Sequence, residues 1–278
     1  MKNVREEIIK NLKSELQANP HVFALWLEGA DSNDTVDQYS DIDIWIDVKD
    51  GHEQKVMNQV RHILSKIGPL DLAQDYNHPD PKIKQSFFHI KGSSVFLLLD
   101  ICIQSHSRTF KFIKEITHEL PFVLFDKKNV TKLYPIDKRK TDREIKRRLQ
   151  DLDYTIRQAS RAKKYILRGK FLEALIYYHK WIMAPLVEIL RIKYRPLTRD
   201  YHLTHISDHL PIKEVKKLEE LYKVYNLKDI DQKTRKAIQW FRKVESELRS
   251  MSEPDVELME FYDPSINAKA VRLVKLLK

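Results

Sequence analysis

Apolar and polar residues alternate strictly between residues 41 and 48, which predicts a β-strand with one face on a core. The apolar face carries Ile42, Ile44, Ile46 and Val48. The opposite face carries Asp41, Asp43, Trp45 and Asp47. A second strand is predicted over 95–103, where Asp100 interrupts a nearly continuous apolar run typical of a central strand.

Other patterns in the first half predict helices and strands in alternation. Helical spacing of apolar residues predicts helices over 2–18, 52–67 and 110–116, and Pro20 ends the first of them. Short apolar or aromatic runs predict strands over 21–27, 70–73, 87–91 and 122–125. The segment 30–40 is polar and is expected to form a loop.

From about residue 137 only the 3.6-residue period of helices remains, over 142–168, 171–194, 211–225 and 231–251. Gly169 separates the first two helices, and Pro185 is expected to kink or restart the second. We therefore predict an α+β chain. Residues 1–137 form a domain with a mixed sheet flanked by helices, and residues 138–278 form an all-α helical bundle.

Charge divides the chain in the same way. Residues 1–137 carry 17 basic and 20 acidic side chains, whereas residues 138–278 carry 33 and 20. A basic half attracts phosphates of a nucleotide, a nucleic acid or a membrane surface, although solvated helix faces give the same composition. The single cysteine, Cys102, and the absence of a signal-like or membrane-spanning apolar run predict a cytoplasmic protein.

The candidate chemistry is carried by three carboxylates. Asp41 and Asp43 project from one strand face about 6–7 Å apart, close enough to share a divalent ion, although a solvated strand face or a helix cap would also explain them. Asp100 lies in an apolar strand, where an ionised carboxylate is costly without a nearby cation. That cation is a metal shared with the other two, or else Asp100 pairs with Lys or Arg or is neutral.

Gly29 follows an apolar strand and precedes Asp41 by twelve residues, so its backbone can approach phosphate oxygens closely. The segment LEGADSNDTVDQYSDIDIWIDV, together with Asp100, resembles the nucleotidyltransferase superfamily that includes DNA polymerase beta. The order of a mixed α/β half and a helical half is similar to the bacterial aminoglycoside 6-adenylyltransferases and lincosamide nucleotidyltransferases. Ala30 stands where that family has serine, and Asp34 where it has a second glycine.

The resemblance implies transfer of a nucleoside monophosphate from an NTP, most naturally ATP, by two Mg²⁺ ions. Asp41, Asp43 and Asp100 would be the metal ligands and catalytic residues, with Asp100 also a candidate base. The nucleotide-binding candidates are Gly29, Ala30, Ser32, Ser40 and Lys180. The helical half would select the acceptor.

Three further groups of polar side chains in the helical half have spacings that suit binding. Glu173 and Tyr177 share a helix face with Lys180 and are candidates for acceptor binding. Arg161, Lys164 and Arg168 form a basic stripe, typical of a solvated face and less often of a phosphate clamp. His202, His205 and His209 have a spacing compatible with a metal, but no cysteine accompanies them, so we interpret them as surface or core histidines.

Three functions fit these observations. The first is transfer to a hydroxyl of a small molecule, although a basic acceptor half is a poor general environment for polycationic aminoglycosides. The second is a nucleotidyltransferase that acts on RNA or on a protein, favoured by the basic half. The third is a non-catalytic nucleotide-binding module, suggested by Ala30. The expected partners are a nucleotide and a small acceptor, with no membrane.

Overall fold

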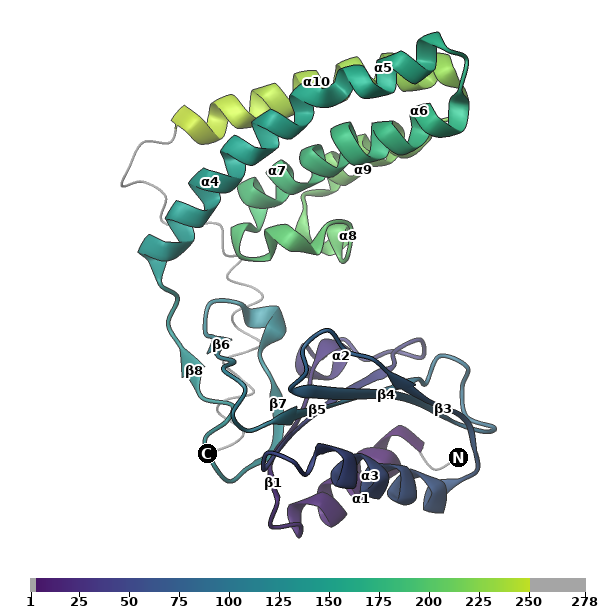
Figure 1. Cartoon of the computed structure of the whole chain (residues 1–278), viewed down its shortest axis with the longest axis vertical. Helices are drawn as coiled ribbons and strands as arrows, with labels where there is room; N and C mark the ends of the chain where they lie inside the picture. The colour runs from purple at the N-terminus through teal and green to yellow at the C-terminus, as the bar shows by residue number, and fades with distance from the viewer. Residues whose placement is uncertain (1–3, 251–278) are drawn as a thin grey trace. The chain divides into compact units, whose positions relative to one another are not determined.

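The computed structural model describes residues 4–250 of the chain. These residues divide into two compact units, of which the first ends at Ile136 and the second begins at Asp137 (Figure 1). Each unit has its own apolar core. The first unit contains a mixed sheet with helices, and the second is helical. The predicted α+β class is therefore confirmed. Residues 2, 3 and 251 of the expected helices lie outside the described residues.

A six-stranded sheet organises the first unit. Its strands are β1 (Val22–Leu27), β2 (Ile42–Val48), β3 (Leu70–Tyr76), β4 (Ile83–Ile90), β5 (Leu99–Ser105) and β7 (Phe122–Asp126), in the order β3-β4-β5-β2-β1-β7. The central pair β2 and β5 is parallel, and the other neighbours are antiparallel. Both central strands therefore begin at the same edge of the sheet.

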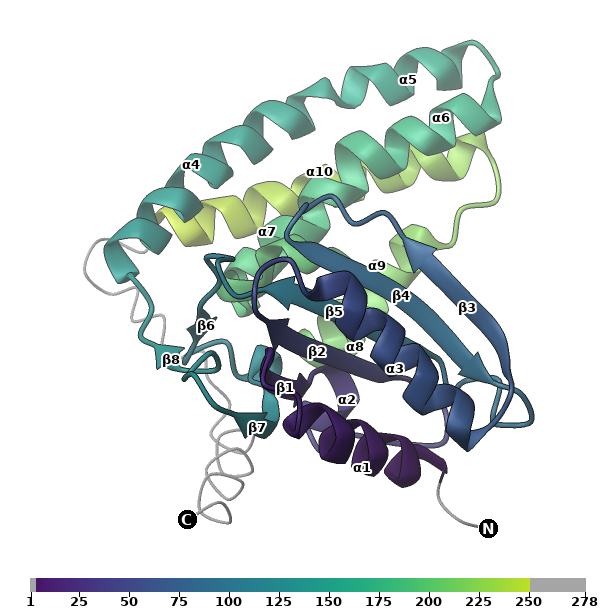
Figure 2. The ribbon, with the colours of Figure 1, turned by 60° about the horizontal axis from the view of Figure 1, so that its bottom comes forward.

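Helices α1 (Val4–Gln17) and α3 (Glu53–Ile67) cover one face of this sheet (Figure 2). In α1 the buried residues Ile8, Leu12 and Leu16 recur every four positions, which produces one apolar side that packs on the strands. The alternating apolar residues of β2 contribute to the same core. The polar side of β2 consequently lies on the opposite face of the sheet.

Three expectations in this unit are wrong. The strand expected over 95–103 begins only at Leu99. The expected helix over 110–116 is absent; Phe112–Ile113 instead forms β6, which pairs in parallel with β8 (Leu133–Tyr134). Phe112 packs edge-on against Trp26, with ring centroids 5.7 Å apart, so a tertiary contact overrides the local helical spacing. The expected loop 30–40 begins inside a short helix, α2 (Gly29–Ser32).

The second unit consists of helices joined by short turns. They are α4 (Lys138–Ile156), α5 (Ser160–Leu167), α6 (Phe171–Tyr178), α7 (Ala184–Tyr194), α8 (Ile206–His209), α9 (Ile212–Tyr222) and α10 (Leu227–Ser250). Gly169, at φ +68°, separates α5 from α6 as expected. A π-helix, His179–Met183, joins α6 to α7, and Pro185 lies in the first turn of α7, where its missing N–H costs nothing. Within residues 4–250, no helix has both the length and the apolar character needed to cross a membrane.

Candidate active site

The three predicted carboxylates lie where β2 and β5 begin. Asp41 directly precedes β2, Asp43 is its second residue, and Asp100 is the second residue of β5. Asp43 and Asp100 are direct partners in the parallel register. The Ile42 N–H donates to the Leu98 carbonyl at 2.9 Å, which fixes the two strand starts side by side. Two acidic stretches that are far apart in the sequence thus meet at one sheet edge.

The electrostatics of this edge favour a cation. The pKa of Asp43 is raised to about 6 by partial burial and then by repulsion from Asp41 and Asp100. Burial also raises the pKa of Asp100. Within residues 4–250, no Lys, Arg or His side chain forms an ion pair with any of the three. Arg5 lowers the pKa of Asp43 and His78 lowers that of Asp100, but these are weaker influences than burial, so the cluster keeps an excess of negative charge.

A neutral amide holds Asp100. Gln85 Nε2 lies 2.7 Å from Oδ1 and 2.9 Å from Oδ2 of Asp100, and the Cys102 thiol lies 3.8 Å from Oδ1. Gln85 is in β4 and is the register partner of Cys102. Among residues 4–250, Asp100 does not form the ion pair with a lysine or arginine that was the alternative expectation. Gln85 instead orients the carboxylate without cancelling its charge.

Gly29 lies against Asp43. Its φ of +61° is one that side-chain-bearing residues rarely adopt, and a Cβ built there would collide with Oδ2 of Asp43. The Glu28 N–H donates to the Asp43 carbonyl at 3.0 Å, so the end of β1 is tied to the start of β2. The glycine is therefore required both by the backbone conformation and by the nearby carboxylate.

The two serine candidates are engaged within their own segment. Ser32 Oγ donates to the Gly29 carbonyl at 2.9 Å, and Ser40 Oγ donates to Asp37 Oδ1 at 3.0 Å. Asp34 adopts a left-handed φ of +54°, a conformation that aspartate tolerates better than most residues. Binding of a triphosphate by either hydroxyl would need its present hydrogen bond to change, and this role stays a prediction.

Arg5 was not singled out from the sequence. This α1 residue forms an ion pair with Asp31 and donates to the backbone carbonyls of Ser40, at 3.1 Å, and Asp41, at 2.7 Å. It therefore clamps both ends of the segment between Gly29 and β2. No sequence signal could have identified it, because its partners lie 26 to 36 positions along the chain.

Glu28 is a second site residue that sequence reasoning missed. Trp26 Nε1 donates to its Oε1 at 2.8 Å. Its pKa is raised to about 7, mainly by burial and further by the nearby Asp43. The available signal was an acidic residue at the end of an apolar strand, directly before Gly29.

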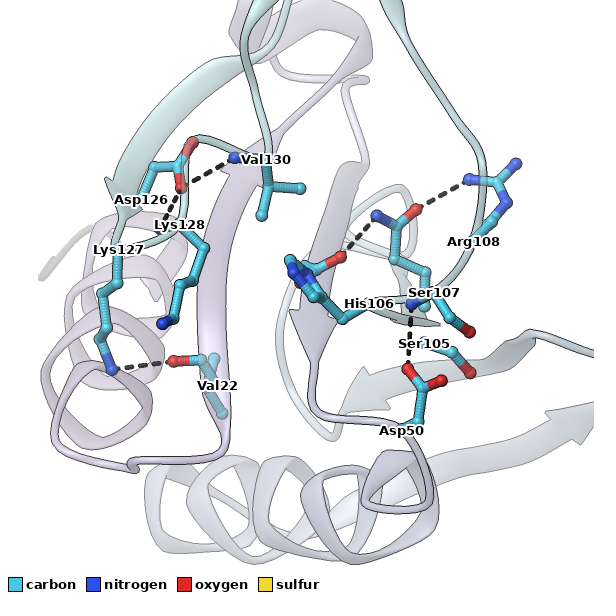
Figure 3. A network of polar contacts seen from close by, with 12 residues as sticks. Val22, Asp50, Ser105, His106, Ser107, Arg108, Asp126, Lys127, Lys128 and Val130 are labelled. Carbon is cyan, nitrogen blue, oxygen red and sulfur yellow. Dashed lines mark hydrogen bonds and ion pairs between the residues drawn. The ribbon is translucent and has the colours of Figure 1, made fainter.

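Asp47 shares the polar face of β2 but lies in a different environment. It is 1% exposed, and Gln104 Nε2 donates to its Oδ2 at 2.8 Å. His106 Nδ1 lies 2.8 Å from its Oδ1, and Arg108 donates to Gln104 Oε1 at 2.8 Å (Figure 3). This carboxylate is satisfied by its neighbours, which indicates a structural role.

Ala30 is the second residue of α2, and the other remaining candidates lie in the second unit. Glu173 and Lys180 are exposed, Tyr177 stacks on Tyr165 with ring centroids 5.1 Å apart, and the Lys180 ammonium lies 5.0 Å from the centre of the Trp181 ring. Their part in nucleotide or acceptor binding stays a prediction.

The histidine trio has a structural explanation for one member. His209 Nδ1 lies 3.1 Å from NH1 of Arg191, whose side chain is fully buried. The Arg191 guanidinium also donates to backbone carbonyls of the segment between Arg191 and His209, including Thr198 at 3.4 Å. His209 thus belongs to a buried arginine network.

The donor chemistry of the carboxylate cluster suits a hard divalent cation, which prefers oxygen ligands and keeps some of its waters. Burial raises the pKa of Asp43 most, and repulsion from Asp41 and Asp100 raises it further. However, among residues 4–250 no three His, Cys, Asp or Glu side chains are arranged to hold one ion. The residues therefore fit Mg²⁺ by type and charge, without forming a complete ligand set of their own.

No protein-family model and no curated protein matches the chain. Among solved structures it is similar to the polymerase core of TRAMP, an RNA surveillance complex, with 16% identity and a TM-score of 0.32 over 80% of this chain and 58% of that one. It thus spans less than two thirds of that relative. A nucleotidyltransferase-like protein from Exiguobacterium sibiricum 255-15 is 12% identical, with a TM-score of 0.29 over 98% and 89% of the two chains. A STING-associated CdnE c-di-GMP synthase from Capnocytophaga granulosa is 17% identical, with a TM-score of 0.24 over 89% and 81%. These values are too low to assign a function, so the function is argued from the residues of this chain.

Proposed function

We propose that this protein is a Mg²⁺-dependent nucleotidyltransferase that moves a nucleoside monophosphate, with ATP as the first candidate donor, to a hydroxyl group. The observation that carries the proposal is the register pairing of Asp43 with Asp100, beside Asp41, with no cationic side chain in ion-pair contact among the described residues. Such a cluster is costly unless a cation joins it. A metal–triphosphate complex supplies that cation together with the substrate.

The candidate residues of the first unit would have distinct roles in this reaction. Asp41 and Asp43 would hold two Mg²⁺ ions, and Asp100 would hold one of them. When bound, the metals would neutralise charge on the phosphates and align attack on the α-phosphorus, with pyrophosphate as the leaving group. Asp100 would accept the proton of the acceptor hydroxyl, a role supported by the raised pKa that burial gives it and by the orientation that Gln85 gives its carboxylate. Gly29 leaves room for the Asp43 carboxylate itself, and its backbone would approach the phosphates.

The acceptor proposed first is a small molecule. This follows the resemblance to the aminoglycoside 6-adenylyltransferase and lincosamide nucleotidyltransferase layout. Residues 1–137 would form the catalytic domain and residues 138–278 the acceptor-binding domain. Glu173 and Tyr177 would contact the acceptor, and Lys180 would contact the triphosphate with Ala30, Ser32 and Ser40.

The test is a mass-spectrometric screen for nucleotidylated products. Each NTP is incubated with Mg²⁺ and a mixture of metabolites and antibiotics, using the parent protein, Asp43→Asn and the control Asp71→Asn. Asp71 is an exposed carboxylate of β3, 2.6 Å from His89 Nδ1. We expect a Mg²⁺-dependent product that Asp43→Asn reduces by about 10³-fold or more and that Asp71→Asn leaves unchanged.

Two outcomes would contradict the proposal in different ways. Equal product formation by Asp43→Asn would remove the carboxylates from the mechanism. Binding of Mg·ATP in a calorimetric titration without turnover of any acceptor would leave the non-catalytic nucleotide-binding module as the better explanation.

An RNA acceptor is the second candidate. It is favoured by one observation, a row of exposed basic side chains along α4 and α5. The same screen includes RNA oligonucleotides with a free 3′ hydroxyl, and lengthened RNA products in place of modified small molecules would support this acceptor.

A further inference from the structure

Eight basic side chains form a stripe along α4 and α5, here called the α4–α5 stripe. It consists of two groups of four, and Arg157 at the start of the second group pairs with Asp153 at 2.9 Å. All eight side chains are exposed, and they are Arg139, Arg143, Lys146, Arg147, Arg157, Arg161, Lys164 and Arg168. The buried residues of the same helices, Leu149, Leu152, Ile156 and Ala162, belong to the apolar core of the second unit. The helices therefore have one apolar side and one basic side.

The stripe is straight because the two helices form one rod. Only a single 3-10 turn, Arg157–Ala159, separates α4 from α5, and the backbone stays right-handed helical through it (Figures 1 and 2). Most successive members of the stripe are three or four residues apart, and Arg147 and Arg157 are ten residues apart, which is close to three helical turns. At these spacings the side chains project from the same side of the helix. At 1.5 Å per residue the rod is about 45 Å long.

This arrangement opposes the stability of α4 when nothing is bound to it. Arg139, Arg143 and Arg147 follow one another at i, i+4 spacing, where like charges repel. Arg139 also lies in the first turn of α4, which contains no acidic residue, and positive charge is unfavourable at a helix N-terminus. In the described part of the chain these three arginines form no ion pair with a carboxylate. An anion along the stripe would relieve both effects.

An aromatic side chain lies within the stripe. Tyr154 is 70% exposed and lies between Arg147 and Arg157 on the same side of α4. An exposed aromatic ring flanked by cations is the combination on which unpaired bases stack while their phosphates are neutralised.

We propose that the α4–α5 stripe binds the backbone of single-stranded RNA, with a base stacked on Tyr154. RNA is favoured over DNA because RNA presents unpaired bases in single-stranded segments. A membrane surface fits less well, since a membrane-binding helix needs a free apolar side and the apolar side of α4 is buried in the core. The inference does not depend on the carboxylates of the first unit or on the proposed transfer reaction.

Fluorescence anisotropy tests the proposal. A labelled single-stranded RNA long enough to follow the rod is titrated with the full chain between about 50 and 200 mM salt. The triple variant Arg139→Gln, Arg143→Gln, Arg147→Gln removes three charges from the stripe. We expect the slope of log K against log salt to fall in magnitude by about 2, because each phosphate contact to a single strand contributes about 0.7.

The matched control removes three charges elsewhere. Lys213→Gln, Lys216→Gln, Lys236→Gln changes exposed lysines of α9 and α10 and alters the net charge by the same amount. We expect this control to keep the parental slope and affinity. Equal losses in the two triple variants, at equal thermal stability, would show that only net charge matters and would overturn the stripe as a site.

Two further arms identify the ligand. We expect Tyr154→Ala to weaken RNA binding roughly tenfold without changing the salt slope. Duplex RNA, single-stranded DNA of the same sequence and vesicles of phosphatidylcholine with phosphatidylserine are compared with the RNA strand. Tighter binding of any of them, or no RNA binding at low salt, would overturn the assignment. Asp43→Asn is expected to bind RNA as the parent does, which separates this result from the fate of the transferase proposal.

Discussion

Two aspartates four residues apart on one face of β2 have opposite environments. Asp47 is buried and accepts hydrogen bonds from Gln104 and His106. Asp43 lies beside two other carboxylates, and no described side chain donates a hydrogen bond or an ion pair to it. The strand thus contains one carboxylate that its neighbours satisfy and one that they do not, and the second is the one proposed to bind metal.

The two environments differ because the residues paired with Asp47 and Asp43 on β5 are of different types. β5 places Gln104 opposite Asp47 but Asp100 opposite Asp43. An amide donor stabilises a buried carboxylate, whereas a second carboxylate destabilises it. The repulsive pair is retained at the end of the strand where the Gly29 turn lies, which is the arrangement expected of a site that receives a cation from outside.

The same substitution at both positions should give opposite results. Asp43→Asn removes repulsion, so we expect an unchanged or slightly higher free energy of unfolding together with loss of transfer activity. Asp47→Asn places an NH₂ group opposite one of its two donors, so we expect a loss of about 1–3 kcal/mol in stability with activity retained well below the melting temperature. Thermal unfolding and the product assay are measured on both variants.

The opposite effects expected for Asp43→Asn and Asp47→Asn on stability and activity give the strongest test of the difference between the two aspartates. A large loss of stability in Asp43→Asn would show that the Asp43 carboxylate has a structural partner. Loss of activity in Asp47→Asn at full stability would move the functional site towards His106 and Arg108.

Gly29→Ala should have the next largest effect. The change forces a Cβ into a left-handed conformation, which costs about 1–2 kcal/mol, and adds a collision with the Asp43 carboxylate. Gly51→Ala is the matched control, because Gly51 also has a positive φ, +80°, but no atom lies within 4 Å of its added Cβ.

The difference between these two variants isolates the contact with Asp43. We expect Gly29→Ala to lose more stability than Gly51→Ala, and only Gly29→Ala to lose activity. Equal costs and equal activities would mean that the glycine serves the turn alone.

The sequence predicts those parts of the fold that follow from local patterning. β2 and α3 occur where expected because each buries one face, and burial imposes period 2 or 3.6. β3 is longer than expected because it is an edge strand with mostly exposed residues, so no alternation marks its end. The segment before β5 is the clearest failure. Val95 and Phe96 are 80% and 49% exposed, and the turn bond from Leu97 N–H to the Ser94 carbonyl stops the strand from starting earlier.

The candidate site divides in the same way. Asp41, Asp43 and Asp100 could be named because carboxylates in apolar strands are visible in the sequence. Gln85, Arg5 and Glu28 could not be assigned, because their contacts depend on strand register and on a helix that packs across the sheet. Residue type indicates candidate chemistry, whereas the partners that tune it are fixed by tertiary structure.

The smallest expected effect concerns pH and Mg²⁺. Asp43 ionises near its ordinary pKa of 3.8 in the unfolded chain but near 6 in the folded one. Between these values the folded state binds more protons, so the free energy of unfolding falls as pH rises. In Asp43→Asn the contribution of Asp43 to this fall in the free energy of unfolding should disappear. The contribution of Glu28, whose pKa is raised to about 7, should remain.

Mg²⁺ should oppose this decline above pH 7, where Asp43 is ionised. An ion present at ten times its Kd contributes about 1.4 kcal/mol, which corresponds to a rise of about 3 °C in Tm for a chain of this size. At pH 5 protons compete for the same oxygens, so the rise should shrink. NaCl at matched ionic strength separates binding from screening. An equal rise in Asp43→Asn would place the ion elsewhere, and it would leave the repulsion between Asp43 and Asp100 without the cation that best explains it.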